Sequence, residues 1–89
     1  MSTSPIDSLR KAIDICGSQA ELARRIAEYK GNPKVRQAHV WNWLNRDQEV
    51  PAHMVIAVEQ VTRAPDGSIQ VSRGELRPDI YPAATERAA

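Results

Sequence analysis

Three side-chain amides stand beside a cluster of bases in the stretch QAHVWNWLNR, residues 37–46. An amide such as that of Gln37 presents a donor and an acceptor side by side, so it can form two hydrogen bonds with one adenine in a DNA major groove. Asn42 carries the same group. Residues 24–46 contain six bases and the single acid Glu28, which gives a formal charge of +5. This charge fits a phosphate-binding surface, and it also fits an ordinary solvated helix face.

The two tryptophans of this stretch, Trp41 and Trp43, must face different surroundings. On an α-helix, residues two apart point roughly 200° from each other. Val40, Trp43 and Leu44 have i, i+3 and i+4 spacing, which predicts that their face is buried. Trp41 then lies on the opposite face with Gln37. An exposed indole there could contact a sugar or a thymine methyl, pack on a partner subunit, or lie flat over a neighbouring helix or turn.

Other residues that often carry chemistry lack the partners they need. No cysteine or carboxylate accompanies His39 or His53 at metal-ligand spacing, and no catalytic carboxylate pair, nucleophile motif or phosphate loop is visible. We therefore expect no enzyme activity, no metal and no cofactor. Cys16 is the only cysteine, so no intrachain disulfide is possible, and its place on an apolar stripe predicts a packed thiol.

The length and composition are those of one small domain. The chain has 89 residues, no apolar run of membrane-spanning length, and an N-terminus without a signal-peptide core. We expect a soluble cytoplasmic protein with no membrane partner. We assign residues 1–82 to the domain and residues 83–89 to a flexible tail, because the tail has little to bury.

Capping residues predict where the first two helices begin. Ser4 is a good N-cap and is followed by Pro5, which suits the first helical position. Gly17 ends this helix in a left-handed conformation. Ser18 caps the second helix, and Glu21 three residues later completes a capping-box pattern.

The remaining elements are also short. Gly31-Asn32-Pro33 ends the second helix, and the third is predicted from about residue 36 to residue 45. A fourth helix begins at Pro51, and Ser72 with Glu75 caps one last helical turn. Residues 69–71 alternate in polarity as a short extended segment does, but they are too few for a sheet. The predicted class is all-α, a helix-turn-helix bundle of four to five short helices with a short extended C-terminal segment.

The stretch GSQAELARRI resembles the second helix of lambdoid phage repressors and Cro proteins, in which a glutamine opens the helix and a small alanine packs against the next one. These positions are Gln19 and Ala23. The stretch QAHVWNWL resembles the recognition helix of those proteins, with Val40 and Trp43 as buried anchors. The intervening residues 27–35 exceed the usual turn of roughly 3–4 residues, so the turn is expected to be larger and basic.

The C-terminal half is similar to the Cro/YdaS-like helix-turn-helix family. There a proline-started helix is followed by a glycine-containing turn and a V-[ST]-R-x-x-L-R-P-D segment, which here is Val71–Asp79. The resemblance covers residues from about Ile6 to Pro82. We expect Arg73, Arg77 and Asp79 to anchor this segment through ion pairs rather than to contact DNA.

This resemblance implies a lambda-repressor-like domain whose recognition helix, at about 36–45, lies in the major groove. Gln19 and Arg36 match positions that hold phosphate in the family, whereas Lys30, Lys34 and Arg46 are assigned by their charge and position. The expected base-reading residues are Gln37, Ala38, Trp41 and Asn42. The expected phosphate-binding residues are Gln19, Lys30, Lys34, Arg36 and Arg46.

The implied function is sequence-specific DNA binding by a Cro-like repressor of prophage or toxin–antitoxin genes. One short helix reads few base pairs, so we expect a homodimer on a palindromic operator in double-stranded DNA. The alternative is a protein-interaction module, such as an antitoxin that binds a toxin, or a protein that binds RNA polymerase, with DNA binding secondary.

Overall fold

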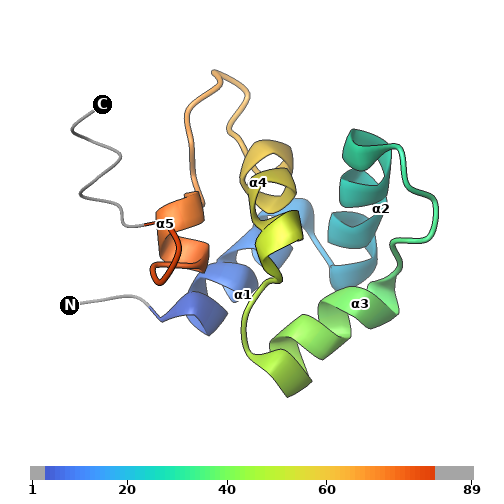
Figure 1. Cartoon of the computed structure of the whole chain (residues 1–89). Coiled ribbons are helices and arrows are strands. Elements are labelled where there is room, and N and C mark those ends of the chain that lie inside the picture. Colours follow the sequence, from blue (N-terminus) through green and yellow to red (C-terminus); the bar gives the residue numbers. More distant parts are fainter. Residues whose placement is uncertain (1–3, 82–89) are drawn as a thin grey trace.

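The computed structural model describes residues 4–81, which are helical with irregular connections (Figure 1). No strand occurs in this range, so the prediction of an all-α bundle of short helices is confirmed. The elements are the α-helices α1 (Pro5–Cys16), α2 (Gln19–Lys30), α3 (Gln37–Asn42), α4 (Ala52–Val61) and α5 (Arg73–Leu76), with the π-helical segment η1 (Trp43–Asp47) directly after α3. Residues 83–89, the predicted tail, lie outside the described range.

The first two helices begin as their sequences predict. The Ser4 hydroxyl accepts a hydrogen bond from the Asp7 backbone N–H (3.3 Å), and the Ser18 hydroxyl accepts one from the Glu21 N–H (3.1 Å). Only half of the capping box at Ser18 forms. The Glu21 carboxylate accepts hydrogen bonds from Arg24 instead, because charge-assisted bonds to a guanidinium compete well with a neutral backbone N–H.

The core lies where α1 crosses the other helices. In Figure 1, α1 runs behind α4, with α2 on one side of it and α5 on the other. Burial of aliphatic side chains at this crossing supplies most of the stabilisation available to a domain of this size. Every main helix contributes at least one of the fully buried residues, which include Leu9, Ala12, Leu22, Ile26, Val40, Val50, Val55, Val58, Val71 and Leu76.

The C-terminal segment closes this core. Ser72 and Glu75 form the complete capping box that their spacing predicts, and Pro78 follows the end of α5. The residues before α5 form no strand, because no neighbouring strand is present to pair with them. Val71 is fully buried, whereas Ile69 is 49% exposed. Val71 therefore belongs to the core, and Ile69 does not.

A buried carboxylate locks this segment onto α4. Glu59 is 1% exposed, and it accepts hydrogen bonds from the Arg73 backbone N–H (2.9 Å) and from the Arg73 guanidinium (2.8 Å). Arg77 donates to the Val50 carbonyl (3.0 Å) and pairs with Asp79 (2.7 Å). The predicted anchoring role of these arginines is confirmed. No helix in residues 4–81 is both long and apolar enough to cross a membrane.

Candidate nucleic-acid interface

The turn between α2 and α3 spans residues 31–36 and is held by its own hydrogen bonds. Gly31 is left-handed (φ 66°), its N–H donates to the Glu28 carbonyl, and the Asn32 N–H donates to the Ala27 carbonyl (2.9 Å). These two hydrogen bonds together form a Schellman motif, which satisfies the last carbonyls of α2. The turn is longer than a usual helix-turn-helix turn, as the sequence predicts, and basic.

The middle of this turn is held by two hydrogen bonds to Asn32 and by burial of Val35. The Asn32 side-chain oxygen accepts a hydrogen bond from the Lys34 N–H (3.0 Å), and the Asn32 carbonyl accepts one from the Val35 N–H (3.3 Å). Val35 is 7% exposed and joins the core. Burial of Val35 anchors the turn, so the start of α3 has a defined position relative to α2.

His39 caps the start of α3, a role that sequence reasoning missed. The Arg36 backbone is extended, and its N–H donates to Nδ1 of His39 at 3.0 Å. A glutamate or glutamine usually accepts this bond from the third helical position. A neutral histidine can do so as well, because one ring nitrogen remains an acceptor. The spacing of His39 from the helix start is the signal that could have identified it.

The predicted recognition helix continues two residues beyond the expected end at Asn45. It changes from α-helix to the π-helical η1 at Trp43, and Gln48 follows in the left-handed region (φ 58°). The N–H groups of Gln48 and Glu49 both donate to the Trp43 carbonyl. The wider turn leaves Trp43 in the core while the chain reverses toward α4.

The two tryptophans occupy opposite faces, as predicted. Trp43 is 4% exposed and packs with Val40, whereas Trp41 is 48% exposed. Gln37 and Ala38 are exposed on the outer surface, and Asn42 is half-buried. The outer face of α3 therefore presents an amide, a methyl group and an indole to solvent, with Asn42 less accessible than expected.

The bases near α3 differ in whether they are already paired. Arg24 pairs with Glu21 (2.6 Å) and Glu28 (2.6 Å), and Arg25 pairs with Glu21 (3.0 Å). The bonds from Arg24, and then those from Arg25, lower the pKa of Glu21 to about 2, so this carboxylate stays charged at neutral pH. Because the charge of +5 omits Glu21, that figure overstates the cationic surface on α2.

Three of the five predicted phosphate-binding residues are bases whose charge is not paired within residues 4–81. Lys34, Arg36 and Arg46 are exposed and form no ion pair with any residue in 4–81. Lys30 donates to the His53 carbonyl (3.1 Å), a contact that joins α2 to α4. Lys30 therefore has a structural contact in addition to its charge.

Gln19 opens α2 next to α3, which passes beneath that end of α2 in Figure 1. Gln19 as a whole is half-buried. Its side-chain oxygen is buried and accepts no hydrogen bond from the described residues. Only the amide nitrogen could donate to a phosphate. The structure thus brings Gln19 to the same side as α3 but does not give it a bonded, preset orientation.

Two helices joined by an anchored turn, with the second presenting an open polar face, define a helix-turn-helix domain. The geometry is a variant with an enlarged turn and a π-helical end to the second helix. The chain belongs to the family described as bacterial toxin YdaS, whose family model matches residues 9–85. No curated protein and no solved structure gave a significant match.

Proposed function

We propose that this protein is a sequence-specific DNA-binding transcriptional regulator whose α3 enters the major groove. The observation that carries the proposal is the contrast between the two faces of α3. Val40 and Trp43 hold one face in the core, and Gln37 stands in solvent on the other. At the first helical residue, the Gln37 amide can reach a base edge and form a paired contact with adenine.

The surrounding charges suit this placement. Lys34 and Arg36 directly precede Gln37, and Arg46 lies at the other end of the helical stretch in η1. These three bases form no ion pair within residues 4–81 and could hold phosphates on either side of the groove. Ala38 and Trp41 offer apolar contact to thymine methyls. The proposed role is non-enzymatic and cytoplasmic, and its genetic setting is a prophage or a toxin–antitoxin pair.

Salt dependence tests the DNA-binding part of the proposal. The logarithm of affinity falls with the logarithm of salt by about 0.9 for each phosphate neutralised, so three contacts predict a roughly 40-fold loss between about 50 and 200 mM salt. Binding to a random duplex is measured by fluorescence anisotropy. The control is Arg10→Ala, which removes a base on α1 that is outside the proposed interface. This variant should keep the salt dependence of the parent. Absence of duplex binding at the lower salt concentration would sink the proposal.

We propose further that the regulator binds its operator as a homodimer. One helix reads only a few base pairs, and two copies on a palindromic site double the sequence that is read. Ile69 and Ile80 are 49% and 41% exposed, and they are candidates for the subunit contact. Sedimentation with operator DNA should give two chains per site. One chain per site at saturating protein would contradict this proposal.

The second candidate is a protein-interaction module of a toxin–antitoxin pair. The description of the family as a bacterial toxin and the 48% exposure of Trp41 favour it. A partner protein would then cover α3, since a large exposed indole is a typical anchor of protein interfaces. A complex with the product of a neighbouring gene that Trp41→Ala disrupts, together with no duplex binding, would support this candidate over the first.

A further inference from the structure

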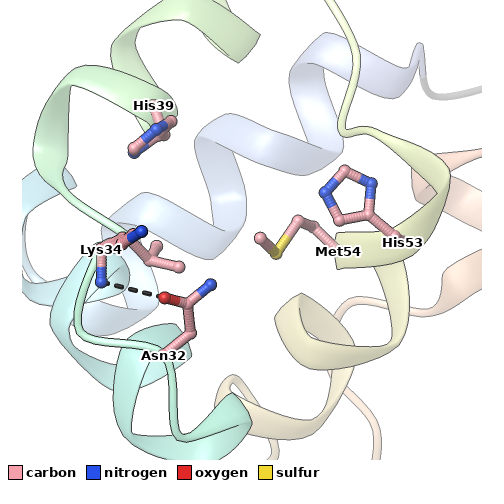
Figure 2. Close-up of a pocket in the computed structure, with 6 residues that line it drawn as sticks. Asn32, Lys34, His39, His53 and Met54 are labelled. Atoms are coloured by element: carbon pink, nitrogen blue, oxygen red, sulfur yellow. Dashed lines mark hydrogen bonds between the residues drawn. The ribbon is translucent and has the colours of Figure 1, made fainter.

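A hollow of about 230 Å³ lies between the turn after α2 and the beginnings of α3 and α4 (Figure 2). Its floor is apolar, because Val35 and Met54 are 7% and 8% exposed. Its rim is polar and comes from three separate parts of the chain. The lining residues are Asn32, Lys34, Val35, His39, His53 and Met54.

Hydrogen bonds within the turn leave donors available to the hollow. Because the Asn32 side-chain oxygen already accepts the Lys34 N–H, the remaining polar group of this amide is its NH₂, a double donor. Figure 2 shows the amide nitrogen on the side of Met54, away from that bond. Lys34 adds an ammonium group that forms no ion pair with residues 4–81.

The cap on α3 determines what His39 offers. Nδ1 of His39 accepts the Arg36 N–H, so the neutral ring carries its proton on Nε2 and can donate there. The ring of His53 forms no hydrogen bond with the described residues, and its N–H is a further donor. No carboxylate lines the hollow. Donors from four side chains thus surround an apolar floor without a competing acid.

We propose that this hollow binds one phosphate group. A phosphate has several acceptor oxygens and a negative charge, which match the amide, ammonium and two imidazole donors around the rim. Metal binding does not fit, since no group of three His, Cys, Asp or Glu side chains comes together in residues 4–81. The phosphate comes from the backbone of DNA bound at α3 or from a free phosphate compound. Only the first source rests on the proposed function.

The first experiment titrates inorganic phosphate against chloride at constant ionic strength and follows backbone amide signals by NMR. The signals of residues 32–39 and 53–54 should shift and saturate. In the double variant Lys34→Ala/His53→Ala, the affinity should fall by about tenfold or more, because bonds to a charged group are lost. Lys11→Ala, which removes an exposed lysine from α1, should bind phosphate like the parent.

Both substituted side chains are exposed, so the double variant should keep the parent's melting temperature. The single variant His53→Gln, which retains an amide donor, should bind with intermediate affinity. Shifts that do not saturate, or that are the same in the parent and the double variant, would overturn the phosphate site. This result would leave DNA binding by α3 unaffected.

The second experiment identifies the source of the phosphate. Duplex affinity is measured in phosphate and in chloride at equal ionic strength. If the hollow holds a DNA phosphate, phosphate should weaken duplex binding by the parent but not by the double variant. If the ligand is free, duplex binding should be unchanged while the NMR shifts saturate. Either result supports the phosphate site, and absence of duplex binding contradicts only the proposed function.

Discussion

The arginines of the C-terminal segment and the bases around α3 are held in contrasting ways. Arg73 pairs with the buried Glu59 (2.8 Å) and also lies over the Tyr81 ring, 5.7 Å from its centroid. Arg77 bonds to a carbonyl and pairs with Asp79 (2.7 Å). The bases around α3, namely Lys34, Arg36 and Arg46, extend into solvent without an ion pair in residues 4–81.

The difference shows that the pairing of a charge tells more about its role than the charge itself. In the C-terminal segment, carboxylates fix the arginines where they close the core. On α2, Arg24 is neutralised within its own helix by Glu21 and Glu28. An exposed base without a partner can exchange its counterions for a phosphate, which is the main source of sequence-independent DNA affinity.

The two tryptophans give the largest predicted contrast between a structural face and an open face. Trp43→Ala should lower the free energy of unfolding by about 3–5 kcal/mol, because it empties a buried site beside Val40. Trp41→Ala should change it by less than about 1 kcal/mol, because Trp41 is 48% exposed.

Thermal melts of both variants check this prediction. For a domain of this size, each kcal/mol shifts the melting temperature by roughly 4–8 °C, so Trp43→Ala should melt well over 10 °C below the parent or fail to fold. A Trp43→Ala protein that melts within a few degrees of the parent would contradict the core role of Trp43.

The buried carboxylate of Glu59 gives the next largest effect. Glu59→Gln should cost roughly 2–4 kcal/mol of unfolding free energy, somewhat less than a fully buried pair, because the Arg73 side chain is 33% exposed. The matched control is Glu28→Gln, which breaks an exposed pair with Arg24 on α2 and should cost under about 1 kcal/mol. Urea titrations of both variants measure the difference, and equal costs would show that burial of Glu59 is unimportant.

Acid should reduce the advantage of the parent over Glu59→Gln. Burial raises the pKa of Glu59, but the hydrogen bonds from Arg73 outweigh it and hold the pKa below its ordinary value. The pair therefore stabilises the fold fully above the usual glutamate pKa of about 4.3, and its contribution falls as the pH drops through the lower folded pKa. Urea titrations over this range should show the two proteins converging, and a constant difference would count against the pair.

Local signals predicted much of this fold. Ser4, Ser18 and Ser72 were each identified as helix caps, because capping depends on residues only three positions away. The faces of Trp41 and Trp43 followed from helical spacing alone. The exposure of Gln37, Ala38 and Trp41 was also predictable, although Asn42 is more buried than expected.

Features that depend on distant contacts were not predictable from the sequence. The pair of Glu59 and Arg73 joins residues 14 apart, and no local pattern indicates it. The sequence also did not predict the change to π-helix at Trp43. The hollow beside His39 and His53 requires α3 and α4 to begin next to one turn, which only the folded arrangement provides.

The comparison of operator and random DNA binding by Gln37→Ala and Lys34→Ala tests the central claim most directly. Gln37→Ala should lower the operator-to-random affinity ratio, because one paired base contact is lost. The free-energy preference for the operator should fall by about 1–3 kcal/mol, and random binding should barely change. Lys34→Ala should weaken both duplexes about equally, because a lysine near phosphate acts through counterion release. Titrations of both duplexes at one salt concentration measure the two ratios. A ratio that Gln37→Ala leaves unchanged would contradict base reading by α3.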